Sequence, residues 1–137
     1  MATRLNPYIS FKGNAAEAME FYKSVFGGKL ETSTFGEAGV PHDPAEANNI
    51  MHAMLTTDNG LVIMGADTPS GMTYDAGSRV SVSLSGEDET ELRGYYGKLA
   101  EGGQIFVPME KAPWGDVFGM CTDKFGITWM VNINQSA

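Results

Sequence analysis

Cysteine is nearly absent from this sequence of 137 residues. Cys121 stands alone, so no disulfide can form within the chain, and structural disulfides belong to oxidising compartments. Cys121 lies in the apolar run VFGMC, which indicates a buried, inert thiol rather than a nucleophile. The shortage of cysteine therefore favours a cytoplasmic protein.

Positive charge and long hydrophobic runs are also scarce. Nine Lys and Arg stand against 17 Asp and Glu, for a formal charge of −8, and they form no basic patch. Nucleic-acid binding needs a basic face, so a nucleic-acid partner is excluded. No apolar run approaches the length of a membrane span, and the start, MATRLNPYISFKGN, lacks the apolar core of a signal peptide. We expect a soluble protein with no membrane partner.

Hydrophobic residues, at 42 per cent, can supply a core, and 17 glycines indicate many turns. Alternation and turn residues predict strands at 5–11, 29–35, 50–57, 60–66, 80–85, 104–110, 116–122 and 127–133. The turn Asp58-Asn59-Gly60 predicts a hairpin between the third and fourth of them. Residues 36–49 read as a polar loop whose role the sequence leaves open.

A helix is predicted after Asn14, which with Glu17 forms a capping-box pattern, and it ends at Gly27-Gly28. Its apolar face is expected to comprise Ala15, Ala18, Met19, Tyr22, Val25 and Phe26. The pattern then restarts. Asp88 and Glu91 repeat the cap, Leu92, Tyr95, Tyr96 and Leu99 repeat the face, and Gly102-Gly103 repeats the end.

A long internal repeat follows from these positions, since Tyr22 and Tyr96 are 74 residues apart, as are Asn14 and Asp88. The order strand-helix-strand-strand-strand occurs twice. The sequence therefore predicts an α+β fold in which two βαβββ modules with curved mixed sheets enclose a cleft. We expect one domain over 1–137, with module one at about 1–68 and module two at about 78–137.

This paired module resembles the vicinal oxygen chelate superfamily, which includes glyoxalase I, extradiol dioxygenases and bleomycin-resistance proteins, and within it the PhnB-like branch. The resemblance rests on NPYISFKGNAAEAMEFYKSVFGGKL, IMHAMLTTDNGLVIMGAD, PWGDVFGMCTDKFG and ITWMVNI, and it covers nearly the whole chain. It implies a homodimer. Members of this branch are often described as demethylubiquinone methyltransferase-type proteins, a description that implies S-adenosylmethionine chemistry.

Metal-using relatives take four ligands, His, Gln or Glu, from the first and last strands of both modules. The matching strands of this chain contain none of these residues and no Asp, and aligning the turns places Met64 and Met130 near the two carboxylate positions. A thioether is a poor ligand for Mg, Mn or Ni but packs well. The resemblance therefore implies no metal site, and we expect no cofactor.

His52 is the imidazole within a predicted strand, and alternation places it on one face with Ile50 and Met54. It is either an acid-base group in the cleft or a hydrogen-bonded structural histidine. Trp114 either walls the cleft or lies in a core or dimer interface. Asn132 should share the face of Met130, with Trp129 packed under a helix, while Asp58 and Asp123 are turn residues and His42 is a loop residue.

The sequence thus predicts that one small organic molecule binds in an apolar cleft without a metal. The expected ligand-binding residues are Tyr8, His52, Met64, Trp114, Met130 and Asn132. The alternative is an enzyme, such as a lyase, an isomerase or a dioxygenase-like enzyme, that uses His52 as its acid-base group. A metal-bound enzyme and a purely structural or regulatory dimer are weaker alternatives. Methyl transfer is disfavoured because no glycine-rich turn opens a parallel sheet.

Overall fold

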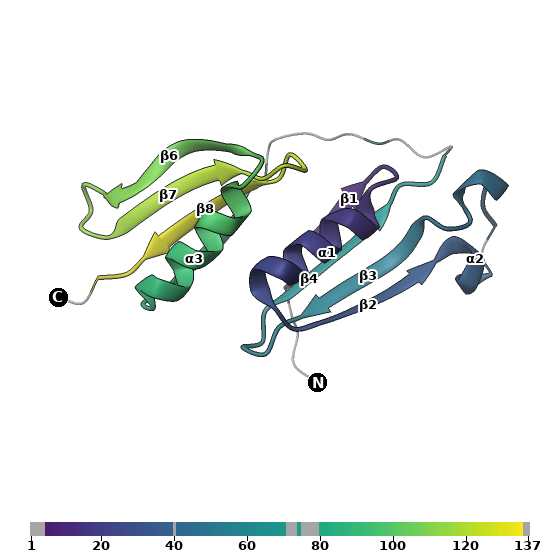
Figure 1. The fold of residues 1–137 in the computed structure, drawn as a ribbon, viewed down its shortest axis with the longest axis horizontal. Helices are drawn as coiled ribbons and strands as arrows, with labels where there is room; N and C mark the ends of the chain where they lie inside the picture. The colour runs from purple at the N-terminus through teal and green to yellow at the C-terminus, as the bar shows by residue number, and fades with distance from the viewer. Residues whose placement is uncertain (1–4, 40, 71–73, 75–79, 136–137) are drawn as a thin grey trace. The chain divides into compact units, whose positions relative to one another are not determined.

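The computed structural model describes residues 5–39, 41–70, 74 and 80–135. The chain divides into two compact units, Met1–Ala76 and Gly77–Ala137 (Figure 1). The first unit contains β1 (Tyr8–Phe11), α1 (Ala15–Phe26), β2 (Lys29–Thr34), α2 (Phe35–Ala38), the 3-10 helix η1 (Pro44–Glu46), β3 (Ile50–Thr56) and β4 (Val62–Asp67). The second contains β5 (Val82–Gly86), α3 (Glu89–Ala100), β6 (Gln104–Lys111), β7 (Val117–Thr122) and β8 (Thr128–Ile133).

Each unit is built around a four-stranded mixed sheet. The strand orders are β1-β4-β3-β2 and β5-β8-β7-β6. The first strand of each unit is parallel to the last, and the remaining neighbours are antiparallel. This confirms the α+β class and the two predicted βαβββ modules. The predicted cleft, and the union of the modules in one domain, stay predictions.

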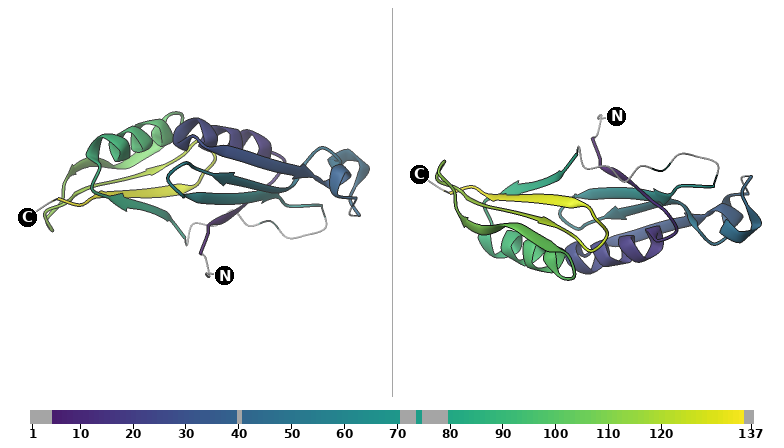
Figure 2. Two further views of the ribbon diagram at one scale, coloured as in Figure 1. Left: turned by 90° about the horizontal axis from the view of Figure 1, so that it is seen from below. Right: turned by 90° about the horizontal axis from the view of Figure 1, so that it is seen from above.

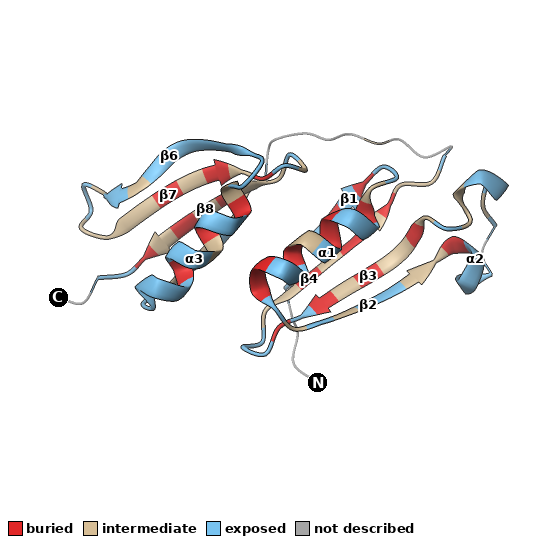
Figure 3. Ribbon diagram, in the orientation of Figure 1, coloured by how far each residue is buried: buried red, intermediate tan, exposed pale blue. Residues whose placement is uncertain are grey.

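One helix covers one face of each sheet, as the views in Figure 2 show for α1 and α3. The six apolar residues predicted for the face of α1 are its buried residues. In α3 the buried residues are Leu92, Tyr96 and Leu99, whereas Tyr95 is partly exposed and donates its hydroxyl to Glu91. Figure 3 marks the buried residues of both helices in red. None of the described helices is long and apolar enough to cross a membrane.

The cap of α1 differs from the prediction. Asn14 makes no side-chain hydrogen bond to the helix. The Asp67 carboxylate, at the end of β4, accepts the N–H of Ala15 at 2.9 Å through Oδ1 and that of Ile50 at 2.9 Å through Oδ2. A distant carboxylate at the helix N-terminus therefore replaces the local cap. In α3 the cap residue is as predicted, since Asp88 accepts the N–H of Glu91 at 3.0 Å.

Two short helices lie in the segment predicted as a loop. Thr34 and Glu37 form a reciprocal capping box that starts α2. Asp43 accepts the N–H of Ala45 and starts η1. His42, from the predicted loop, lies with its ring 6.4 Å from that of Phe35. These helices are too short to carry a periodic apolar face, which is the signal used for the longer ones.

The turns before the last strands are built alike in both units. The N–H of Asp123 donates to the carbonyl of Ile127, and that of Thr57 donates to the carbonyl of Leu61. In return, the side-chain oxygens of Asp123 and Thr57 accept the N–H groups of Ile127 and Leu61. Asp123 is therefore a turn residue, as predicted, and its counterpart is Thr57 rather than Asp58.

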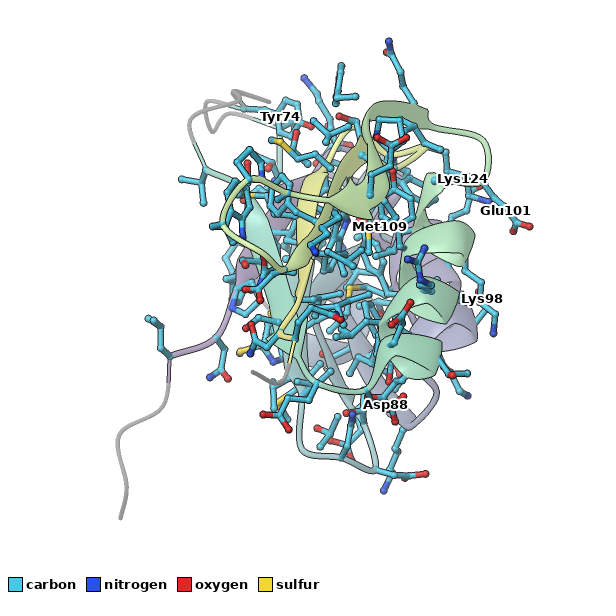
Figure 4. The ribbon with its side chains drawn as sticks, turned by 90° about the vertical axis from the view of Figure 1, so that its left-hand side faces the viewer. Tyr74, Asp88, Lys98, Glu101, Met109 and Lys124 are labelled. Atoms are coloured by element: carbon cyan, nitrogen blue, oxygen red, sulfur yellow. The ribbon has the colours of Figure 1, made fainter. Side chains whose placement is uncertain are left out.

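Strand β6 is an edge strand and differs from the others in its exposure. Ile105, Phe106 and Val107 are 51, 54 and 38 per cent exposed. The pairing of β6 with β7 is irregular between Ile105 and Val107 and again between Val107 and Glu110. Figure 4 shows Lys98 on α3 and Glu101, the residue after its end, pointing outward.

Candidate functional site

Alternation gives every central strand one buried and one part-exposed face. In β4, Ile63, Gly65 and Asp67 are buried, while Met64 and Ala66 are partly exposed. A Cβ on Gly65 would lie 3.2 Å from the Phe11 ring and 3.3 Å from Met19 of α1, so this face packs against the helix. We call the opposite face of each sheet its open face.

Tyr8, His52 and Met64 lie together on the open face of the first unit. Tyr8 pairs with Met64 across β1 and β4, and Met54 pairs with Met64 across β3 and β4. The Tyr8 hydroxyl lies 3.4 Å from His52 Nδ1, and the two ring centroids are 5.9 Å apart. This half of the predicted site is therefore assembled within one unit.

The expected companion Ile50 does not belong to this face. Ile50 is buried, and the pairing of β2 with β3 shifts where Ser33 faces His52 and Thr34 faces Ile50. A bulge of this kind reverses the alternation beyond it. The prediction that Ile50 shares a face with His52 is therefore wrong, whereas Met54 does share it.

The Tyr8–His52 pair has acid-base capacity. An imidazole accepts at one ring nitrogen and donates at the other, and a phenol can do both. Tyr8 is 52 per cent exposed and His52 is part-buried, so both remain reachable. The pair can exchange a proton with a ligand, but the 3.4 Å separation makes their own hydrogen bond weak.

Met130 and Asn132 lie together on the open face of the second unit, as predicted. Both are part-buried, while Trp129, on the buried face of β8, is 1 per cent exposed. Met120 pairs with Met130, and Phe118 pairs with Asn132. This face thus combines two thioethers and an aromatic ring with the Asn132 amide and with the hydroxyls of Ser83 and Ser85, which pair with Met130 and Asn132.

Trp114 reaches the same face from the turn between β6 and β7. Its indole Nε1 donates to Asn132 Oδ1 at 3.2 Å, and its ring meets that of Phe118 edge-on with centroids 5.4 Å apart. Asn132 Nδ2 donates to Asp116 at 3.0 Å and to Asn134 at 2.8 Å. The bonds from Asn132 and from the Gln135 N–H lower the pKa of Asp116.

A surface pocket of about 310 Å³ lies at the tip of this hairpin. Its lining comprises Val107, Pro108, Glu110, Lys111, Ala112, Pro113, Trp114 and Phe118. All of these residues belong to the second unit, so the pocket is complete without the first. Sequence reasoning found Trp114 but missed Phe118 and Glu110, which are cross-strand partners on one face.

The two units place different chemistry at matching positions. Met64 and Met130 both lie 7 residues after the residue that begins the turn, Thr57 or Asp123. By the strand register, His52 corresponds to Phe118 and Tyr8 to Ser83. The alignment of turns that relates Met64 to Met130 also relates His52 to Phe118. It could therefore have identified Phe118 as a candidate site residue from the sequence.

The donor set does not suit a hard divalent ion. Tyr8 pairs with Met64, and Ser83 pairs with Met130, so neutral hydroxyls and thioethers occupy these positions. Hard cations prefer carboxylate and carbonyl oxygens over these groups. No group of three or more His, Cys, Asp or Glu side chains gathers within the described ranges.

Cys121 lies on the opposite side of β7 from this site and is fully buried. Burial, with a smaller effect of the Asp123 charge, raises the pKa of its thiol to about 11. A neutral, inaccessible thiol is a poor nucleophile. This confirms the prediction that Cys121 is buried.

Comparison with known proteins places the chain in one family. The family model described as 3-demethylubiquinone-9 3-methyltransferase matches residues 3–132. Protein YjdN of Escherichia coli K12 is 29 per cent identical over 140 residues, covering 94 per cent of each chain.

Solved structures agree with this match. The structure of PA1353 from Pseudomonas aeruginosa is 32 per cent identical with a TM-score of 0.84, covering 98 per cent of this chain and 100 per cent of that one. The PhnB protein from Bacillus cereus is 27 per cent identical with a TM-score of 0.76, covering 96 and 100 per cent. A bleomycin resistance determinant from transposon Tn5, 16 per cent identical with a TM-score of 0.58 over 98 and 100 per cent, shares the fold.

Proposed function

The chain belongs to the family described as 3-demethylubiquinone-9 3-methyltransferase, a PhnB-like branch of the vicinal oxygen chelate superfamily, and on this premise we propose that it binds a small organic molecule without a metal. The proposed binding residues are Tyr8, His52 and Met64 on the open face of the first unit, and Trp114 and Met130 on the open face of the second, with Asn132 beside them. The observation that carries the proposal is the composition of these faces.

Two features of these faces support binding rather than simple packing. Each sheet already has a helix on its other face, so the open face is the side left for a ligand. Met64 and Met130 are only part-buried, whereas Met19 on the buried face of α1 is fully buried. Thioethers adapt to ligands of different shape, and apolar sites with few polar groups suit flat or aliphatic molecules over highly charged ones.

Methyl transfer does not enter the proposal, although the family description includes it. Binding of S-adenosylmethionine is typically built on a parallel sheet whose first strand leads through a glycine-rich turn into a helix. Each sheet here has one parallel pair, β1 with β4 or β5 with β8. The turn before α1 is Lys12-Gly13-Asn14, with a single glycine.

A second candidate function is acid-base catalysis by His52. The observation that favours it is the Tyr8 hydroxyl at 3.4 Å from His52 Nδ1, because a neighbouring phenol can orient the imidazole. The reaction would be a lyase, isomerase or dioxygenase-like reaction, as in other members of the superfamily.

A thermal-shift screen of aromatic drugs, quinones and thiols tests ligand binding. A ligand that binds only the folded protein raises the melting temperature, and the rise should persist in excess EDTA because no metal is needed. Stabilisation that EDTA abolishes would overturn metal-independent binding. A screen with no stabilising compound would count against binding itself.

Substitution of His52 separates the two candidates. If the protein only binds, Trp114→Ala should weaken ligand binding more than His52→Ala does. If His52 is the acid-base group, His52→Ala should leave binding intact and lower turnover by about 10²–10⁴-fold. A loss of both binding and folding in His52→Ala would contradict both roles.

The proposal includes a homodimer in the cytoplasm. The exposed apolar side chains of β6 give a surface that pairing can cover, and Cys121, being reduced and buried, is compatible with a reducing compartment. Light scattering at micromolar concentration should give about twice the chain mass of 14.7 kDa. A mass of one chain would exclude the dimer, and recovery of the protein outside the cytoplasmic fraction would exclude the location.

A further inference from the structure

We propose that Asn132 is a positioning residue that holds the Trp114 indole as the wall of the hairpin-tip pocket, and that this pocket takes a planar aromatic group of the ligand. The proposal rests on the proposed small-molecule binding and deepens it. It differs from the sequence prediction, in which Asn132 itself orients a polar ligand.

The hydrogen bonds fix the direction of the Asn132 amide. An indole N–H can only donate, so the atom facing Trp114 must be the amide oxygen. The carboxylate of Asp116, ionised because its pKa is lowered, only accepts, so the atom facing it must be the amide nitrogen. Both ends of the amide are thus used within the protein, which leaves little capacity for a ligand.

The turn that carries Trp114 is held at several points. The N–H of Ala112 donates to the carbonyl of Asp116 at 2.7 Å, and the N–H of Gly115 donates to the carbonyl of Ala112 at 2.9 Å. Gly115 has a φ of 100°, which a residue with a Cβ rarely adopts. The Asp116 carboxylate also accepts the N–H of Gln135 at 3.0 Å. Asn132 joins this braced turn to strand β8.

The result is an aromatic surface that is fixed yet exposed. Trp114 is 60 per cent exposed although its N–H is bonded and its ring contacts Phe118. Two aromatic rings set edge to face form a corner into which a flat ring can stack. A volume of about 310 Å³ is at the small end of ligand pockets and suits one ring system rather than a whole large molecule.

The Phe118 side of the pocket favours a ring with a positive or N–H donor edge. Glu110 pairs with Phe118 across the hairpin, so its carboxylate lies on the face of the aromatic corner. Lys111, the next residue along the strand, also lines the pocket and offsets part of this negative charge. The net charge of −8 on the chain also favours a positively charged ligand.

The first experiment tests positioning in the protein without ligand. Asn132→Ala should raise acrylamide quenching of Trp114 and lower its fluorescence anisotropy, because the indole loses its anchor. Trp129→Phe serves as the background, so that emission comes from Trp114 alone. Asn134→Ala is the control, since it removes a bond from Asn132 without touching Trp114. Unchanged quenching and anisotropy in Asn132→Ala would overturn the positioning role. Asn132→Leu, similar in volume, replaces the alanine variant if that fails to fold.

The second experiment is a double-mutant cycle with proflavine, a planar fluorescent cation whose own anisotropy reports binding. Trp114→Ala and Asn132→Ala should each raise the Kd by about 3–10-fold, as expected for one aromatic contact. The double variant should be no weaker than Trp114→Ala, because Asn132 acts through the indole. If the double variant instead raises the Kd by the product of the two single factors, Asn132 contacts the ligand directly. That result would overturn the proposal.

The experiments distinguish failure of the aromatic-pocket proposal from failure of the proposed small-molecule binding. Folded protein that shows no proflavine binding overturns the assignment of the pocket to planar aromatic groups. Stabilising compounds of another class in the thermal-shift screen would then leave the proposed function standing. If both assays show no binding, both fail.

Discussion

Asp67→Ala should lower the free energy of unfolding by about 3–5 kcal/mol, because two hydrogen bonds to a buried carboxylate are lost and their N–H donors stay behind. Asp67 is 4 per cent exposed and accepts the N–H groups of Ala15 and Ile50. The first donor begins α1 and the second begins β3. One carboxylate therefore fixes the helix to the end of the sheet, and its negative charge faces the positive end of the helix dipole.

Urea unfolding followed by circular dichroism measures this effect. Asp58→Ala is the matched control, since Asp58 is an exposed turn aspartate that should change stability by less than about 0.5 kcal/mol. Asp67→Asn should fall between the two because the amide keeps one acceptor oxygen. A stability of Asp67→Ala equal to that of Asp58→Ala would show that the buried carboxylate is not needed.

Trp129→Ala, a single substitution in the second unit, should lower the free energy of unfolding by about 3–5 kcal/mol. Trp129 leads the largest fully buried side chains and its indole N–H donates to Asp123 Oδ2 at 2.9 Å. Truncation leaves a cavity beneath α3 and removes one of the donors that satisfy the buried Asp123 carboxylate. The other two are the N–H groups of Phe125 and Ile127, at 2.8 and 3.1 Å.

The same unfolding assay tests this prediction, and the chain supplies its own control. Trp114→Ala removes the same side chain from a site that is 60 per cent exposed, so its cost should be about 1 kcal/mol or less. Trp129→Phe should retain most of the packing and lose mainly the bond to Asp123. Equal costs for the two alanine variants would mean that burial of Trp129 does not govern stability.

The fold could be predicted from sequence to the extent that it rests on periodicity. The face of α1 was found residue by residue because a helix of 12 residues repeats its apolar positions often enough to be distinctive. The alternation of Trp129, Met130 and Asn132 assigned the two faces of β8 for the same reason. Long-range pairings such as β1 with β4 have no local signal, and the module pattern predicted mixed sheets without specifying which strands pair.

Features that depend on contacts between distant residues were missed or wrong. Asn14 has the local pattern of a cap, but Asp67, 52 residues after Ala15, accepts the bond from the Ala15 N–H. The bulge that turns Ile50 away from His52 depends on the pairing with β2, which periodicity within β3 cannot reveal. In the candidate site, the Trp114–Asn132 bond joins a turn to a strand 18 residues on and has no sequence signature.

The equivalence of Thr57 and Asp123 has a consequence for the history of the chain. A tandem gene duplication would leave two segments that share turn geometry and register, and the 66-residue offset that relates these turns also relates Met54 to Met120 and Met64 to Met130. Divergence since then has been uneven. Methionine stands at both positions of the two pairs. By contrast, His52 is equivalent to Phe118, and Ala66 is equivalent to Asn132. An ancestor with two identical halves would present a ligand with the same chemistry twice, whereas the present halves offer an imidazole in one copy and an amide-held indole in the other, so each copy has become free to specialise.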